Sequence, residues 1–222
     1  MEKSNKLFMT ILSSIVCLLP IILGLVVYED LPERMVMQWD LQGNPNWDAP
    51  KSFGIFGLPI FLLLVNVFMR FVIGTDPKKK NQSPFVREMF LWMPAMMSLI
   101  FNPIMIYSAL GVNIPTVKIS FLFVGALIVF SGNYMNKNRQ NYTIGIRLPW
   151  TLDDPENWNK THRLGGFVWM IGGVLFMILT FLPFNMTVMT NLIYVVLAVI
   201  CLIPTVYSYM LYKNKQKIKS EE

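Results

Sequence analysis

The residues that could carry out acid–base chemistry gather in one segment of the chain. His162 is the only histidine, and Asp153 and Asp154 lie shortly before it. An imidazole that is hydrogen-bonded to a carboxylate is a common arrangement of a general base and the group that orients it. This set of residues makes an enzyme that acts through His162 one hypothesis about the chain.

Few residues are of the right type for metal binding or nucleophilic catalysis. Transition-metal sites usually draw on several histidines and cysteines. The two cysteines, Cys17 and Cys201, both fall within long apolar stretches, where we expect packing thiols. The sequence has no glycine-rich phosphate loop and no recognisable nucleophile motif. We therefore expect no cofactor and no metal, and an enzyme is the least favoured class.

The composition indicates the class of protein in which His162 and its neighbouring acids are placed. Charged residues make up 14% of the 222 residues and hydrophobic residues 54%, whereas a soluble domain carries about 25% charged residues. Stretches of about twenty residues contain no charge at all, which is the length of a helix that crosses a bilayer. The composition excludes a soluble globular domain, a disordered chain, a disulfide scaffold and a free nucleic-acid-binding protein.

Six apolar stretches are long enough to cross a membrane, and each must be helical because lipid cannot satisfy open backbone groups. They are residues 7–27, 53–73, 89–110, 119–135, 166–184 and 189–212. The sequence thus predicts an all-α, polytopic integral membrane protein with six transmembrane helices. The first stretch is expected to be a retained helix, because it is longer than the apolar core of a signal peptide and no small-residue cleavage site follows it.

Lysine and arginine are distributed very unequally between the two sides of the predicted helices. One side has 15, in the N-terminal tail, the 74–88 loop, the 136–165 loop and the C-terminal tail, and the other side has three. Arg70 lies near the inner end of the second span. Positive residues collect on the cytoplasmic side, so both termini are predicted to be cytoplasmic and the 28–52 loop extracellular. The net charge of +6 then reports topology and not a nucleic-acid partner.

The 28–52 segment is acidic and aromatic. Its net charge is −3, and Gly43-Asn44-Pro45 predicts a turn between two tryptophans. Acids and aromatic rings outside the membrane fit a cationic amphipathic peptide, while tryptophans near a span end also serve as headgroup anchors. The candidate binding residues are Glu29, Asp30, Glu33, Trp39, Asp40, Trp47 and Asp48.

The 132–166 segment predicts a helix that begins at Asp154 and continues into the fifth span. Asp154 suits an N-cap, Pro155 the first helical position and Glu156 the first turn. Four residues then share one face of the helix, namely Trp158, Thr161, His162 and Gly165. Glycines that repeat every seven residues, at 165 and 172 and at 166 and 173, permit a close helix approach. Residues 142–150 are expected to form an ordered, extended connection.

This segment resembles the signature of the SdpI family of bacterial membrane proteins. The resemblance rests on Gly132 and on the following positions: Asn133, Asn141, Gly145, Arg147, Pro149, Trp150, Thr151, Trp158, Thr161 and His162. The 31–59 stretch also resembles an N-terminal membrane module of unknown function that is often fused to this family, although Trp39 replaces its usual histidine. We accordingly predict a two-helix module at 1–75 and an SdpI-like four-helix region at 76–222.

The resemblance implies an immunity protein of the bacterial cytoplasmic membrane, which gives resistance to a secreted antimicrobial peptide toxin. It also implies a signal receptor that sequesters a cytoplasmic transcriptional repressor. The expected partners are therefore the lipid bilayer, a cationic peptide toxin and a repressor, with no direct nucleic-acid contact. A small transporter or exporter is the alternative, although no ionisable residue falls at the centre of a span. Binding of lipid phosphates is an equal alternative for Arg147, Lys160 and Arg163.

Overall fold

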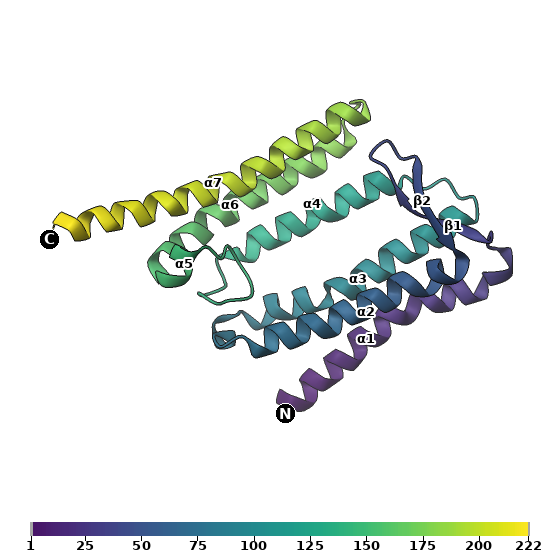
Figure 1. Cartoon of the computed structure of the whole chain (residues 1–222), viewed down its shortest axis with the longest axis horizontal. Helices are drawn as coiled ribbons and strands as arrows, with labels where there is room; N and C mark the ends of the chain where they lie inside the picture. The colour runs from purple at the N-terminus through teal and green to yellow at the C-terminus, as the bar shows by residue number, and fades with distance from the viewer. Residues whose placement is uncertain (1, 222) are drawn as a thin grey trace. The chain divides into compact units, whose positions relative to one another are not determined.

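The computed structural model describes residues 2–221, with side chains from Leu7 onward. Within this range six helices are long and apolar enough to cross a membrane, which confirms the predicted spans and the all-α class (Figure 1). They are α1 (Glu2–Val26), α2 (Lys51–Thr75), α3 (Pro84–Ala109), α4 (Thr116–Met135), α6 (Pro155–Phe181) and α7 (Met186–Glu221). Short elements join them, including two 3₁₀ turns, η1 (Tyr28–Asp30) and η2 (Lys79–Asn81), and the helix α5 (Pro149–Asp153).

The chain forms two compact units. The first contains the residues up to Gly74 together with Arg87–Val117, and the second contains Thr75–Val86 together with the residues from Lys118 onward. Most of α3 therefore belongs to the same unit as α1 and α2. The predicted division of the sequence into 1–75 and 76–222 concerns family modules, and it stays a prediction.

The first unit carries a small antiparallel hairpin, β1 (Arg34–Trp39) and β2 (Pro45–Pro50), that the sequence analysis did not predict. The turn that was predicted there is present. The carboxylate of Asp40 accepts hydrogen bonds from the backbone N–H groups of Gln42 at 2.9 Å and Asn44 at 2.8 Å. Gly43 has φ +88°, a conformation that glycine adopts readily.

Polar side chains join the helices inside the first unit. The amide of Asn66 donates to the carbonyl of Leu91 at 2.7 Å, and the amide of Asn102 donates to the carbonyl of Gly54 at 3.1 Å. Both asparagines are fully buried, so they face the interior of the unit. An amide at this depth needs such a partner because lipid offers none.

Arg70 also turns into the first unit instead of outward. Its guanidinium donates to the hydroxyl of Ser13 at 2.8 Å, to the Oδ1 atom of Asn66 at 3.2 Å and to the carbonyl of Met9 at 3.3 Å. The side chain thereby joins α1 to α2, where three neutral oxygens stabilise its charge.

Close backbone contacts between glycines hold the second unit together. A Cβ atom added to Gly132 on α4 would lie 2.8 Å from the carbonyl oxygen of Gly166 on α6. One added to Gly173 would lie 2.8 Å from the backbone nitrogen of Val129. Helices α6 and α7 lie side by side in Figure 1, and Gly172 leaves room for Ile200. The predicted close approach of helices at these glycines is confirmed.

Candidate functional site at the start of helix α6

Trp158 and His162 form a buried stack on the first turns of α6. Their ring centroids lie 3.9 Å apart with an interplanar angle of 20°, and both side chains are almost completely buried. The helix begins as the sequence predicts, because the Asp154 carboxylate accepts a hydrogen bond from the N–H of Glu156 at 3.0 Å and Pro155 follows it. The start of this helix thus directs the stack toward the preceding loop.

The backbone determines the protonation of His162. Its Nε2 atom accepts a hydrogen bond from the N–H of Ile146 at 2.9 Å, so Nε2 carries no proton. Its Nδ1 atom lies 2.8 Å from the carbonyl oxygen of Trp158, to which it can only donate. His162 is therefore a neutral imidazole with the proton on Nδ1. Both ring nitrogens are engaged by backbone groups, and neither is paired with Asp153 or Asp154, contrary to the proposed base and orienter.

Gly145 allows the loop to lie directly on this stack. Its φ is +127°, and a Cβ atom there would collide with Nε2 of His162 and would lie 3.0 Å from the Trp158 ring. Only glycine satisfies both conditions, since a side chain would meet the stack and would also disfavour this backbone conformation. The loop and the helix therefore meet without any intervening side chain.

Two further motif residues organise the loop that carries Gly145. The Asn141 amide donates to the carbonyls of Arg139 and Ile144, and its oxygen accepts from the N–H groups of Thr143 and Ile144, at 2.7 to 3.1 Å. The Thr151 hydroxyl accepts from the N–H of Leu148 at 2.8 Å. With Pro149 at its first position, this bond nucleates α5. The expectation of an extended 142–150 connection is therefore wrong at its end, where Pro149 and Trp150 begin α5.

A chain of hydrogen bonds links α5, α6 and α7. The Trp150 indole donates to the hydroxyl of Ser208 at 2.8 Å, and this hydroxyl donates to the Asn157 oxygen at 2.7 Å. The Thr161 hydroxyl donates to the same oxygen at 2.9 Å, and the Asn157 amide donates to the carbonyl of Ser208 at 2.9 Å. Sequence reasoning found Trp150 and Thr161 but missed Asn157 and Ser208. For Asn157, the one available signal was its position one helical turn before Thr161. No signal in the sequence indicated Ser208.

Asp76 is a third residue that sequence reasoning missed. Its carboxylate accepts hydrogen bonds from the hydroxyl of Thr143, the N–H of Tyr142, the N–H of Lys78 and the amide of Gln82. It thus ties the residues after α2 to the loop. Burial raises the pKa of the Asp76 carboxyl, but the hydrogen bonds, that of Thr143 first, outweigh burial and hold this pKa below its ordinary value.

The lowered pKa of Asp76 predicts a pH dependence of the loop. A carboxyl whose pKa is lower in the folded state stabilises the fold above its unfolded pKa of about 3.9, and this contribution is lost as the pH falls below it. We expect the amides of Tyr142 and Lys78, which both donate to this carboxylate, to lose hydrogen-exchange protection below about pH 4. In an Asp76→Asn variant this step should be absent, and a step of equal size there would contradict the assignment.

The remaining residues that resemble the family signature lie at the surface of the buried cluster around Trp158 and His162. Asn133, Arg147 and Pro149 are exposed, and the Arg147 guanidinium donates to the carbonyl of Tyr142 at 2.8 Å. Trp150 packs against Tyr209 and Tyr212 of α7. We use the term 138–162 junction for the loop, α5 and the first turns of α6. Among residues 2–221 no cluster of three or more histidine, cysteine or acidic residues could hold a metal ion.

The five acids of the predicted outer segment differ in whether other groups of the chain contact their carboxylates. Asp40 organises the hairpin turn, and Asp48 forms a two-point ion pair with Arg34 at 2.7 and 3.1 Å, which lowers the pKa of Asp48. A third acid, Glu33, lies 3.3 Å from Lys51 but stays largely exposed. The other two, Glu29 and Asp30, are exposed and have no ion-pair partner among the described residues. Trp39 is half-buried, whereas Trp47 is exposed and packs edge-on against Phe53.

Comparisons with known proteins match two separate parts of the chain. Residues 137–208 match the model of the SdpI/YfhL protein family, and residues 15–63 match a domain of unknown function, DUF1648. The chain is 29% identical over 209 residues to a Bacillus subtilis protein named Immunity protein SdpI, which covers 92% of this chain and 96% of that protein. No solved structure matches the chain.

Proposed function

We propose that the chain protects a bacterium against a secreted antimicrobial peptide toxin, because residues 137–208 match the model of the SdpI/YfhL protein family. The chain is a multi-pass bacterial membrane protein that is similar over almost its whole length to an immunity protein. The observation that carries the proposal is the 138–162 junction. Five residues that resemble the family signature are buried together and hydrogen-bonded in it, namely Asn141, Thr151, Trp158, Thr161 and His162.

The proposal assigns His162 a positioning role and no catalytic one. A general base must have a free nitrogen within reach of a substrate proton, whereas both nitrogens of this imidazole are engaged by backbone groups. The imidazole holds the loop on α6. A movement of α6 would therefore change the loop, which is how binding at one side of the membrane would be transmitted to the other.

The proposal also places both termini and the 138–162 junction in the cytoplasm and the hairpin outside. Support comes from the 15 lysines and arginines on one side against three on the other. In this orientation the junction would dock a cytoplasmic transcriptional repressor, and the toxin would approach the hairpin. Trp150 with Tyr209 and Tyr212 would lie at the inner headgroups, where aromatic side chains are enriched.

Glu29 and Asp30, the two exposed acids without an ion-pair partner among the described residues, are the expected contact for a cationic peptide. We expect a Glu29→Gln, Asp30→Asn double variant to reduce protection several-fold, because two charges that no partner neutralises are removed from the docking surface. The measurement is the concentration of peptide that inhibits a sensitive strain expressing each variant. Asp48→Asn is a poor comparison because it breaks the Arg34 pair, so Glu221→Gln, which removes an exposed acid outside the 138–162 junction, is the control. An equal loss in the control would contradict the outer docking surface.

A survival assay tests the proposed function. The protein is expressed in a sensitive bacterium and challenged with cationic secreted peptides, alongside Arg147→Ala and His162→Ala. We expect protection by the natural sequence and loss of protection by His162→Ala, because that change removes the acceptor for the Ile146 N–H. Retained protection in both variants would remove the 138–162 junction from the mechanism.

A further inference from the structure

Two loops at one end of the second unit carry an excess of positive charge. Residues 76–83 and 136–147 contain six lysines and arginines against one acid. Hydrogen bonds join the two loops, because the Asn81 amide donates to the carbonyl of Gln140 at 2.8 Å and the N–H of Arg139 donates to the carbonyl of Asn81 at 3.1 Å. The positive side chains of both loops therefore belong to one surface of the molecule.

The positive charges of this surface are not neutralised within the chain. We use the term basic surface for Lys78, Lys80, Lys137, Arg139 and Arg147. None of these five side chains forms an ion pair with an acid in the part of the chain that the structure describes, and all but Lys78 are exposed. The single acid of the two loops already accepts four hydrogen bonds from neutral groups. The basic surface is therefore expected to attract a negatively charged ligand.

A pair of aromatic rings adjoins the basic surface. Phe85, on the first turn of α3, is 52% exposed and packs against Tyr134 near the end of α4, with 5.0 Å between the ring centroids. The Nζ atom of Lys137 lies 4.1 Å from the centroid of the Tyr134 ring, and the N–H of Ser83 donates to the Oδ1 atom of Asn138 at 2.9 Å. The aromatic pair and the cations therefore form one amphipathic surface.

The ends of two spanning helices place this surface at the edge of a membrane. Helix α3 begins at Pro84 and α4 ends at Met135, and both are long and apolar enough to cross a bilayer. A tyrosine at a span end lies at the level of the headgroups, and basic residues just beyond it reach anionic headgroups. A ligand that fits both features has a negatively charged headgroup and an acyl chain, as an anionic phospholipid has.

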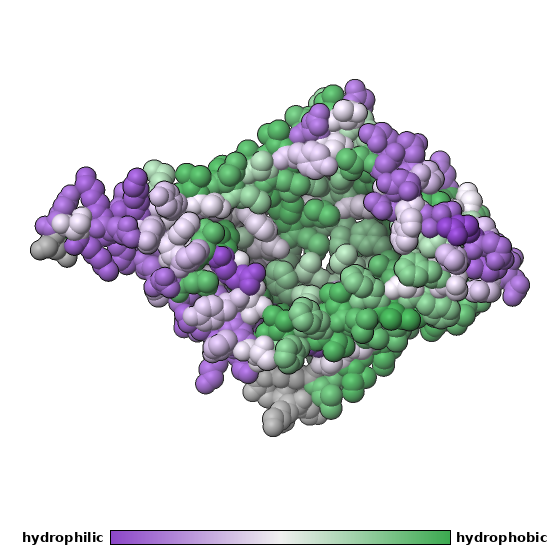
Figure 2. Space-filling model, viewed as in Figure 1, coloured by the Kyte–Doolittle hydropathy of each residue, from purple (hydrophilic) through white to green (hydrophobic). Residues whose placement is uncertain are grey.

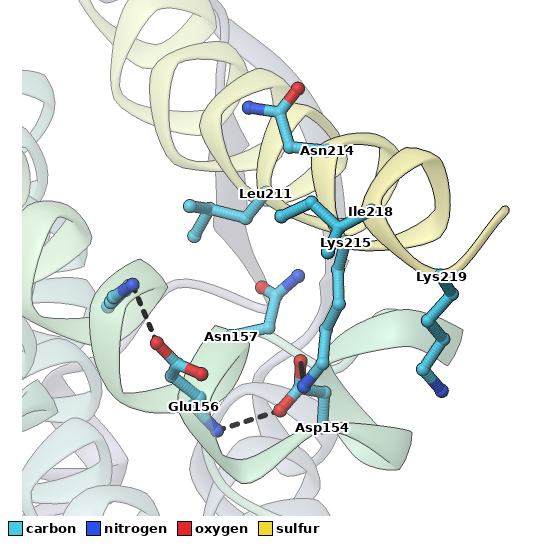
Figure 3. Close-up of a pocket in the computed structure, with 9 residues that line it drawn as sticks. Asp154, Glu156, Asn157, Leu211, Asn214, Lys215, Ile218 and Lys219 are labelled. Atoms are coloured by element: carbon cyan, nitrogen blue, oxygen red, sulfur yellow. Dashed lines mark hydrogen bonds and ion pairs between the residues drawn. The ribbon is translucent and has the colours of Figure 1, made fainter. Parts of the chain in front are cut away.

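The other lysine-rich surface of the second unit, the end of α7, lacks this arrangement. Figure 2 shows it as a hydrophilic extension of an otherwise apolar helix. Residues 213–221 contain four lysines. Lys215 pairs with Asp154 at 2.8 Å (Figure 3), and Lys217 lies 3.9 Å from Glu221. Among the described residues, no aromatic ring lies beneath any of these four lysines. The end of α7 therefore provides a control for charge alone.

We propose that the basic surface and the aromatic pair form a binding site for an anionic phospholipid. The phosphate would accept charge-assisted hydrogen bonds from the cations, Lys137 and Arg139 foremost because they follow directly on the end of α4. The acyl chain would pack along Phe85 and Tyr134. A lipid bound there would also stabilise the 138–162 junction, to which Arg139 belongs. The site goes beyond the proposed function and does not depend on it.

A lipid titration of the purified full chain tests this site. The chain is kept in a mild non-ionic detergent, and native mass spectrometry counts the bound phosphatidylglycerol or phosphatidylcholine as each lipid is added. We expect the first phosphatidylglycerol to bind about tenfold more tightly than the first phosphatidylcholine. A Lys137→Gln, Arg139→Gln double variant should lose most of this preference. The matched control is a Lys213→Gln, Lys219→Gln double variant, which removes two charges from the end of α7.

A second comparison separates a bound lipid from a bound phosphate. Phe85→Ala leaves the basic surface intact, and it should weaken the binding of phosphatidylglycerol several-fold because it removes one ring from the acyl contact. Glycerol phosphate carries the phosphate without acyl chains. We expect it to displace phosphatidylglycerol only at a much higher concentration than that of the lipid.

Four results would overturn the lipid site. Equal binding of the two lipids would exclude recognition of the anionic headgroup, and equal weakening by the two double variants would show general charge attraction. Unchanged binding by Phe85→Ala would exclude the acyl contact. Displacement of phosphatidylglycerol by glycerol phosphate at the concentration of the lipid would assign the site to a free phosphate.

Discussion

A Gly145→Ala variant is expected to lose about 3 kcal/mol of unfolding free energy, the sum of a backbone and a packing cost. The φ of +127° disfavours any residue with a Cβ atom, and this Cβ would also press on the rings of His162 and Trp158. These rings are buried and stacked, so they cannot move aside without breaking the hydrogen bond between the Ile146 N–H and His162. The variant should consequently lose protection as well.

Gly111→Ala separates the two causes of this loss. Gly111 has a comparable φ of +85°, but nothing lies within 4 Å of an added Cβ, so it should cost only about 1–2 kcal/mol. Both variants are compared by thermal unfolding in detergent micelles, with tryptophan fluorescence as the signal. If Gly145→Ala costs no more than Gly111→Ala, the close contact between the loop and the ring stack is not important for stability.

A Gly132→Ala variant is expected to have a similarly large effect, about 3 kcal/mol, at the contact between α4 and α6. The new Cβ would lie 2.7 Å from the backbone nitrogen of Met170 and 2.8 Å from the carbonyl oxygen of Gly166. Backbone atoms inside a helix cannot rotate away as a side chain can, so the two helices must separate along their contact. The 138–162 junction at the start of α6 should weaken with them.

Gly74→Ala is the matched control for the helix contact. It is the same substitution within a helix, but no atom lies within 4 Å of the added Cβ. Alanine favours a helix over glycine by up to about 1 kcal/mol, so this variant should be neutral or more stable. The measurement is the midpoint temperature of thermal unfolding. An equal loss of stability in both variants would contradict the proposed role of close packing.

The sequence predicted those features of the fold that depend on neighbouring residues. Apolar length determined the six spans, and Asp154 followed by Pro155 determined the start of α6. The shared face of Trp158, Thr161 and His162 followed from helical spacing, and all three are buried together. These features are local because a helix and its N-cap depend only on residues within a few positions.

Contacts between distant residues could not be predicted in this way. Asp76 and Ser208 join the motif from 67 and 58 positions away, and neither has a neighbouring signal that indicates a partner. The hairpin was missed for a different reason. Its second strand begins and ends with proline and is mostly exposed, so it lacks the alternation that identifies a strand. The role of Gly145 likewise became apparent only from the position of the ring stack.

The central claim is that this chain is an immunity protein whose 138–162 junction is required for protection. The most direct measurement is the ratio of inhibitory peptide concentrations for a sensitive bacterium with and without the chain, at matched protein levels in the membrane. We predict a ratio of at least about ten for one or more secreted cationic peptides with the natural sequence, and a ratio near one with Gly145→Ala. A ratio near one for every peptide with the natural sequence would contradict the claim.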